Sequence, residues 1–236
     1  MNAVAAAIAA GPGRHGEFFG RGGHDPYERT LLQGRGQLSL RPLERAAPGN
    51  PGEVLFSVQD WCAPATDDER ALLATLHGPL LDVGCGPGRM LAAAEQAGLA
   101  AVGVDPSAGA VRLARSRGVR ALQQSIFAPV PHEGLWGSVL LLDGNVGIGG
   151  NVSALLSRLS VVAAPGGRIL VEADPRPGQD TSYRAVLEDA AGRGSEPFPW
   201  AQAGADALGG HAAAAGLAVA GRRILQGRVF VTLRRP

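Results

Sequence analysis

The sequence predicts an α/β fold with a mostly parallel sheet and helices on both of its faces. From Pro79 onward, short apolar runs alternate with longer amphipathic segments, which is typical of βα units. A glycine-rich turn follows the first apolar run directly. Two closely spaced apolar runs end the chain, and strands so close together pair only as an antiparallel hairpin.

Each expected strand is short and apolar, and each expected helix has one apolar face. The strands are predicted at residues 80–83, 101–104, 121–124, 138–142 and 168–172, followed by hairpin strands at 217–225 and 229–233. The helices are predicted at residues 89–97, 107–117, 151–162 and 203–215. Gly118 suits the left-handed conformation that often ends a helix. The pattern is therefore five βα units followed by a hairpin.

The organisation of the chain changes before this region. Residues 1–60 are irregular and locally rich in Gly and Pro, so we expect an N-terminal extension that is partly disordered and serves as a substrate lid. Residues 61–236 are expected to form the ligand-binding domain. A chain of 236 residues is long enough for one such domain with additions.

The composition argues against several functional classes. The net charge is +1, which does not suggest a nucleic-acid-binding surface. The chain has no Lys, and we attribute its many Arg, Ala and Gly residues to GC-rich codons. Two cysteines without metal-ligand spacing suggest neither a disulfide scaffold nor a metal site. Residues 1–10 lack the basic start of a secretory signal, and no apolar run is long enough to span a membrane. We therefore expect a cytoplasmic protein, monomer or homodimer, without membrane or nucleic-acid partners.

The glycine-rich turn points to a particular kind of ligand. Residues 80–89 read Leu-Leu-Asp-Val-Gly-Cys-Gly-Pro-Gly-Arg, a strand leading into a helix. Such a turn lets a ligand approach the backbone and offers helix N–H groups to an anion. Its Gly-x-Gly-x-Gly spacing differs from the Gly-x-Gly-x-x-Gly of dinucleotide-binding loops. Asp82 would repel a pyrophosphate but attract an ammonium group.

A second acid completes the pattern. Asp105 ends the second predicted strand, about 20 residues further on, where a carboxylate can bind both hydroxyls of a ribose. A ligand with an ammonium, a carboxylate and a free ribose diol satisfies the turn, Asp82 and Asp105 together. S-adenosylmethionine has these groups, and S-adenosylhomocysteine is its product after methyl transfer.

Residues 80–90 resemble motif I of class I S-adenosylmethionine-dependent methyltransferases, and residues 102–107 resemble their acidic second motif. The resemblance runs from Trp61 to the C-terminus and is nearest to the small-molecule group called type 11. It implies a Rossmann-like, mostly parallel sheet of seven strands, including the C-terminal antiparallel hairpin, in the order 3-2-1-4-5-7-6. Ser125 stands where this family usually has an acid that contacts adenine, and Ile126 can pack on the adenine ring. The residues implied to bind the cofactor are Asp82, Gly84, Cys85, Gly86, Gly88, Asp105, Pro106, Ser125, Ile126 and Asp143.

Substrate-facing residues are expected at the carboxyl ends of the strands. Asp143 and Asn145 follow the fourth strand and are the catalytic candidates, although an Asp or Asn beside Gly equally suits a turn. The loop lacks the motifs of DNA amino-methylating and cytosine C5 enzymes. Cys85 is expected to be a small buried residue in the turn, not a nucleophile. The substrate candidates are Asp25, Tyr27, Arg35, Glu172 and Trp200.

The leading hypothesis is an enzyme that methylates O, N or C of a small molecule by in-line displacement. Histidines are scattered and identify no general base. The alternatives are a non-catalytic module that binds S-adenosylmethionine or S-adenosylhomocysteine, a nucleic-acid methyltransferase, and a nicotinamide-dependent oxidoreductase. Asp82 and the glycine spacing argue against the last of these.

Overall fold

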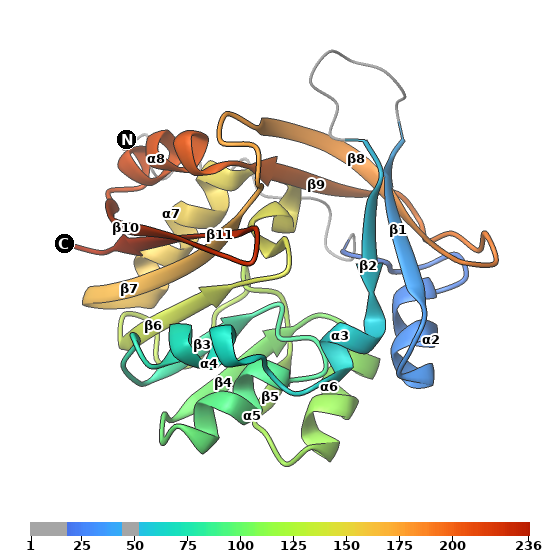
Figure 1. The fold of residues 1–236 in the computed structure, drawn as a ribbon, viewed down its shortest axis with the longest axis horizontal. Helices are drawn as coiled ribbons and strands as arrows, with labels where there is room; N and C mark the ends of the chain where they lie inside the picture. Colours follow the sequence, from blue (N-terminus) through green and yellow to red (C-terminus); the bar gives the residue numbers. More distant parts are fainter. Residues whose placement is uncertain (1–17, 44–51) are drawn as a thin grey trace.

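The computed structural model describes residues 18–43 and 52–236, which form two sheets and the helices packed on them (Figure 1). Residues 1–10, in which no signal peptide is expected, lie outside the described residues, as does most of the Pro- and Gly-containing stretch at 46–52. The extension predicted for residues 1–60 is therefore described only in part.

The larger sheet has seven strands in the order β10-β11-β7-β6-β3-β4-β5. Neighbours from β7 to β5 pair in parallel, while β11 runs antiparallel to β7 and to β10. When only the strands of this sheet are numbered along the chain, and the order is read from β5 to β10, it is 3-2-1-4-5-7-6. The fold prediction is therefore confirmed. The strands are β3 (Leu80–Val83), β4 (Ala101–Asp105), β5 (Ala121–Gln123), β6 (Trp136–Leu141), β7 (Ala163–Ala173), β10 (Ala218–Leu225) and β11 (Arg228–Arg234).

Helices cover both faces of this sheet because its strands are apolar on both sides. Leu81 and Val83 of β3 pack toward the helices α7 (Val152–Val162) and α8 (Ala205–Ala214). Leu80 points the other way, into a second core with α4 (Asp67–Leu73), α5 (Arg89–Gln96) and α6 (Ala108–Ser116). Because β3 and β4 are parallel neighbours, their carboxyl ends lie together at one rim of the sheet.

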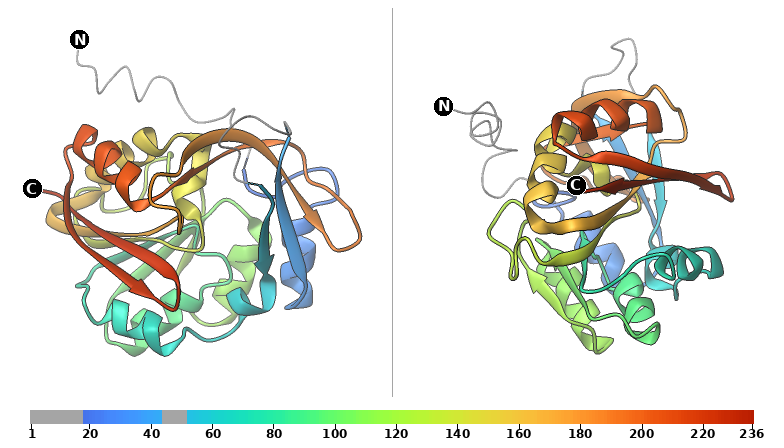
Figure 2. Two further views of the ribbon diagram at one scale, coloured as in Figure 1. Left: turned by 45° about the horizontal axis from the view of Figure 1, so that its top comes forward. Right: turned by 90° about the vertical axis from the view of Figure 1, so that its left-hand side faces the viewer.

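The smaller sheet was not predicted. Its four antiparallel strands have the order β2-β1-β8-β9 and the bounds β1 (Gln37–Pro42), β2 (Val54–Ser57), β8 (Asp180–Asp189) and β9 (Phe198–Ala203). Two strands precede residue 60 and two lie between β7 and α8, so this sheet combines segments from both sides of the predicted domain boundary. Figure 2 shows β8 and β9 reaching from the larger sheet to β1 and β2.

A third core joins the smaller sheet to the rim. Leu38, Leu40 and Leu187 from the strands pack with Leu31 of the helix α2 (Pro26–Gln33) and with Val58 of the helix α3 (Val58–Cys62). Leu38, Leu40 and Val58 are fully buried, so this part of residues 1–60 is integral to the fold. The smaller sheet thereby stands fixed opposite the carboxyl ends of β6 and β7.

Candidate functional site

Two cavities adjoin at the rim of the larger sheet. The glycine-loop cavity has a volume of about 730 Å³ and lies over the ends of β3 and β4. The inter-sheet cavity has a volume of about 760 Å³ and lies between the rim and strands β1, β2 and β9. Both volumes are typical of small-molecule sites. The walls that the two cavities share are formed by Trp61, Arg89, Asp143 and Trp200.

The glycine loop between β3 and α5 has a backbone that favours glycine. Gly84, Gly86 and Gly88 have φ values of 72°, 52° and 84°, which bend the chain sharply around the rim. The Asn145 Nδ2 donates hydrogen bonds to the carbonyls of Val83 and Gly84, at 2.9 and 3.0 Å. Asn145, predicted as catalytic, thus holds the glycine loop in place while also lining the glycine-loop cavity.

Asp82 is a buried carboxylate without a partner. Its side chain lines the glycine-loop cavity and the residue is 4% exposed. Among the described residues, nothing donates a hydrogen bond to it. Burial raises its pKa to about 7; nearby Arg89 opposes this rise, and the charges of Asp143 and Asp105 add to it. A cationic ligand group in the cavity would supply the charge that the carboxylate lacks.

Asp105, at the end of β4, is also 4% exposed but is held in place. Its two carboxylate oxygens accept hydrogen bonds from the backbone N–H groups of Gly86, at 3.0 Å, and Ser107, at 2.8 Å. Burial raises its pKa to about 6 despite these bonds. Each oxygen keeps lone-pair capacity for a further donor, so the carboxylate suits a diol in the cavity.

The adenine region is predicted at the loop after β5. Ser125 and Ile126 both line the glycine-loop cavity, as does Pro106. The Ser125 Oγ accepts the N–H of Phe127 at 3.2 Å, which leaves its hydroxyl hydrogen for another acceptor. Cys85 is buried in the loop and also lines the cavity, and burial raises the pKa of its thiol well above the usual range, which disfavours the thiolate that a nucleophile needs.

The N-terminal segment contributes Tyr27 to the cavity. A Cβ added to Gly86 would lie 3.3 Å from the Tyr27 hydroxyl oxygen, which shows how close this tyrosine is to the loop. Among the described residues, its hydroxyl has no hydrogen-bond partner. Its ring packs edge-on against Phe19 and Trp61, with centroid distances of 5.2 and 5.9 Å. Tyr27 therefore combines a fixed ring with a free polar end.

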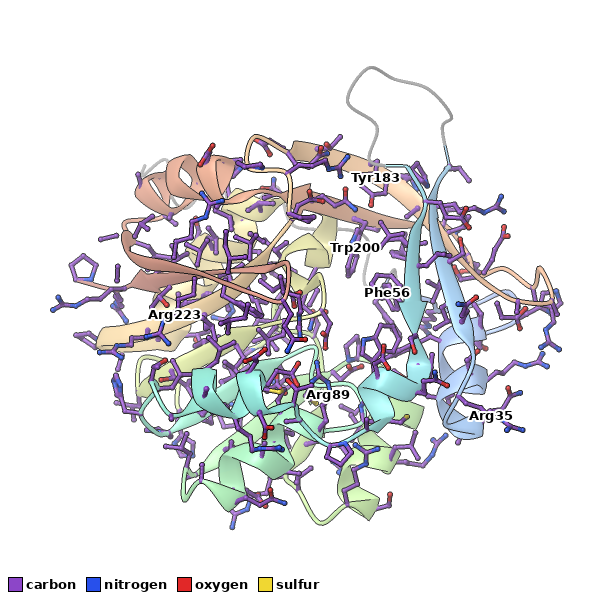
Figure 3. All side chains as sticks on the ribbon, viewed as in Figure 1. Arg35, Phe56, Arg89, Tyr183, Trp200 and Arg223 are labelled. Atoms are coloured by element: carbon purple, nitrogen blue, oxygen red, sulfur yellow. The ribbon has the colours of Figure 1, made fainter. Side chains whose placement is uncertain are left out.

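Two other predicted substrate residues do not reach either cavity. Arg35 is exposed in the turn after α2 and extends from the outer surface (Figure 3). Asp25 is exposed, and its Oδ1 accepts the N–H of Gly22 at 2.7 Å, a local turn contact. Of Asp25, Tyr27 and Arg35, the three residues predicted on this segment, only Tyr27 lines a cavity.

Asp143 and Glu172 belong to a charged network that the sequence did not reveal. Arg89 donates to both carboxylate oxygens of Asp143, at 2.9 and 2.7 Å. Arg228 donates to both oxygens of Glu172, at 2.8 and 2.7 Å, and to Asp143 at 3.1 Å. Because both Asp143 oxygens accept from guanidinium groups, this residue is better suited to fixing the rim than to accepting a proton. Its φ of 55° agrees with the turn role.

Glu69 lies at the centre of this network and is 1% exposed. It pairs with Arg89 and, at 2.7 Å, with Arg228. Burial by itself would raise the pKa of Glu69, but the bonds from the two arginines and from the Thr66 N–H outweigh it and lower the pKa to about 2. Glu69 is also the third helical residue of α4 in a capping box with Thr66. That Thr-x-x-Glu pattern was the sequence signal for this missed residue.

Other candidates lie outside the cavities. The imidazole of His211 contacts Ser153 at 2.7 Å and Asp180 at 3.0 Å, away from both cavities. Within residues 18–43 and 52–236, no cluster of His, Cys, Asp and Glu could hold a metal ion. None of the helices in that part of the chain is long and apolar enough to cross a membrane.

The strand order, the glycine loop and the two buried acids define a methyltransferase-type α/β fold. A protein-family model described as a methyltransferase domain matches residues 80–167, from β3 into β7. This part of the chain, which includes the glycine loop and Asp105, is therefore similar to a methyltransferase domain. No curated protein sequence matches the chain significantly.

Solved methyltransferase structures share the fold. A Bacteroides fragilis S-adenosylmethionine-dependent methyltransferase, solved with S-adenosyl-L-homocysteine, is 19% identical, with a TM-score of 0.67 over 88% of this chain and 92% of that one. An amino pentose methyltransferase from Micromonospora echinaspora is 22% identical (TM-score 0.51, 72% and 88% covered). A Burkholderia thailandensis 1,6-didemethyltoxoflavin-N1-methyltransferase is 17% identical (TM-score 0.52, 72% and 77% covered).

Proposed function

We propose that this protein transfers a methyl group from S-adenosylmethionine to a small molecule. The observation that carries the proposal is the carboxylate of Asp82, which is buried and has no partner among the described residues. It lines the same cavity as the glycine loop and the carboxylate of Asp105, which two backbone N–H groups hold in place. A ligand with an ammonium group and a ribose diol satisfies both acids. The matching methyltransferase domain and the three neighbouring structures support the same cofactor.

The residues present fit this cofactor in defined roles. Asp82 would pair with its α-ammonium, Asp105 would accept from the ribose hydroxyls, and the loop at Ser125 and Ile126 would bound the adenine. The Tyr27 hydroxyl is available to donate to its carboxylate. When bound, S-adenosylmethionine supplies an electrophilic methyl group on a positively charged sulfur. The protein's contribution is then to align an acceptor with that methyl group and to exclude water.

The acceptor would enter from the inter-sheet cavity, because the two cavities share the walls formed by Trp61, Arg89, Asp143 and Trp200. The volume of the inter-sheet cavity, about 760 Å³, and the position of this cavity between two sheets suit a small molecule. Both Cys62 and Cys85 are free thiols, which agrees with the cytoplasmic location expected from the sequence.

Calorimetric titration with S-adenosylhomocysteine, with NAD as a control, tests the cofactor assignment. We expect micromolar binding of S-adenosylhomocysteine and no response to NAD. Asp105→Ala removes the acceptors for the ribose diol and should abolish measurable binding. Wild-type protein that does not bind S-adenosylhomocysteine would overturn the proposal. Binding without turnover across a broad acceptor screen would instead favour a non-catalytic binding module.

A further inference from the structure

We infer that the acceptor is an amine held in the inter-sheet cavity, so that the methyl group is transferred to nitrogen. This inference rests on the proposed function and adds the chemical class of its substrate. It follows from three features of the cavity: its excess of carboxylates, the pairing of its arginines, and its aromatic wall.

The charge of the cavity lining is negative. Six acids and three arginines line it, which gives a formal net charge of −3. The network of Glu69, Asp143 and Glu172 with two arginines contributes −1 of this charge, within the rim. The lining acids are Glu53, Asp60, Glu69, Asp143, Glu172 and Asp174, and the lining arginines are Arg89, Arg176 and Arg228.

The arginines are already paired with carboxylates, so an acidic acceptor would have to compete with those carboxylates for a guanidinium group. Arg89 and Arg228 each contact at least two carboxylates of the network. Arg176 donates to both oxygens of Asp174, at 2.9 and 3.0 Å, and to Gln202 at 3.2 Å. An acceptor carboxylate or phosphate would have to displace one of these bonds, and it would enter a negative field.

Two acids at the cavity remain without a cationic partner. Asp60, on α3, has neither a hydrogen bond nor an ion pair within the described part of the chain. Glu53 accepts a hydrogen bond from the Ser39 hydroxyl and pairs with no described cation. No cation in residues 18–43 or 52–236 neutralises either carboxylate, so the two attract a positively charged group to the opening.

An aromatic wall lies beside these acids. Phe56 and Trp61 pack with centroids 5.2 Å apart, and Trp200 continues the wall from β9. Figure 3 shows Phe56 and Trp200 at the smaller sheet, with Arg89 across the opening from them. Aromatic faces attract ammonium groups, and removal from water strengthens that attraction. Such a wall beside uncompensated carboxylates selects an ammonium-bearing molecule over an alcohol of the same size.

The transfer to nitrogen balances without any further reagent. A bound ammonium first gives a proton to water or to a cavity carboxylate. The amine lone pair then forms a bond to the methyl carbon, while the carbon–sulfur bond breaks and its electron pair stays on sulfur. The products are a methylated ammonium and the neutral thioether S-adenosylhomocysteine. The positive charge passes from sulfur to nitrogen, where the negative cavity stabilises it.

The test compares three probes of matched size: 2-phenylethylamine, 2-phenylethanol and 3-phenylpropanoate. Binding is followed by tryptophan fluorescence with and without S-adenosylhomocysteine, and turnover with S-adenosylmethionine is followed by mass spectrometry. We expect the amine to bind about tenfold more tightly than the other two and to be the one that gains a methyl group. Equal or tighter binding of the alcohol or carboxylate overturns the inference, as does no binding of any probe at millimolar concentration.

Asp60→Asn adds a matched control within the same experiment. The side chain is exposed on α3, so the variant should fold normally, yet amine binding should weaken about threefold while alcohol binding stays unchanged. Asp67→Asn removes an exposed charge outside both cavities and should change the binding of neither the amine nor the alcohol. Normal S-adenosylhomocysteine binding without amine preference refutes this inference alone. If the wild-type protein does not bind S-adenosylhomocysteine, the proposed function is refuted, whichever probe binds.

Discussion

Replacing Asp82 with asparagine should make the ligand-free protein more stable while removing its affinity for S-adenosylhomocysteine. The carboxylate is buried, accepts no hydrogen bond from the described residues and faces the glycine-loop cavity. Asparagine has nearly the same shape and no charge. The substitution therefore removes a desolvated charge without breaking a bond, and it also removes the group proposed to bind the α-ammonium.

The magnitude follows from the pKa of the carboxyl. Burial raises that pKa from 3.8 to about 7. A tenfold change in an ionisation equilibrium is worth about 1.4 kcal/mol, so ionised Asp82 costs about 4 kcal/mol of stability at pH 8. At pH 5 the folded protein carries Asp82 protonated and the unfolded chain does not, and the cost falls to about 2 kcal/mol. The stabilisation by Asp82→Asn should therefore grow as pH rises from 4 to 7 and then level off.

Thermal unfolding of both proteins at pH 5 and pH 8 measures this effect. For a chain of this size, about 4 kcal/mol corresponds to a rise in Tm of roughly 10 °C at pH 8. Asp105→Asn is the contrasting variant, because its carboxylate accepts two backbone N–H groups, and an amide can satisfy only one of them. An unchanged or lower Tm for Asp82→Asn at pH 8 would refute the reasoning, since Asp82 would then have a partner.

Three further predictions follow from the same geometry. Glu69→Gln should lower the free energy of unfolding by about 3 kcal/mol above pH 5, because the pKa of Glu69, about 2, reflects its pairing with two arginines that would lose this partner. The control Asp67→Asn, exposed on the same helix, should change the Tm little. Similar shifts in Tm for both variants would contradict the network. Tyr27→Phe should weaken S-adenosylhomocysteine binding two- to tenfold by calorimetry with an unchanged Tm, since only a hydroxyl facing the cavity is lost; equal affinity would show that the hydroxyl makes no contact. Wild-type affinity for S-adenosylhomocysteine should fall about fivefold between pH 7 and pH 6 as Asp82 takes up a proton, and a flat profile would exclude Asp82 as the ammonium partner.

The local pattern of the sequence was sufficient for the larger sheet and the glycine loop. The strands β3 and β6 are buried at every position because helices cover both faces of the sheet, and glycine is required where φ is positive, as at Gly84 and Gly86. Asp82 and Asp105 follow from their places at strand ends. These features depend on residues close together in the chain, so a linear reading captures them.

The smaller sheet shows where that reading ends. β1 pairs with β8, and Leu38 lies opposite Asp189, about 150 residues away in the chain. Alternation was present in both segments, with Leu38 and Leu40 in one and Ala185 and Leu187 in the other. The alternation of buried and exposed residues predicts a strand but does not identify the strand that pairs with it. Two short strands form a sheet only when that partner is present.

Tertiary structure also decided the roles of the charged residues. Asp143 and Glu172 stand at the strand ends where catalytic groups are expected, but Arg228, from the last hairpin, converts them into parts of a fixed network. Arg35 and Tyr27 are eight residues apart, yet only one faces the cavity, because the direction of α2 is set by its packing against the smaller sheet. The sequence by itself determined the fold class and the cofactor motif, since both depend on the spacing of residues that lie close together in the chain. The inter-sheet cavity required the folded chain, because its walls come from segments that are far apart in the sequence.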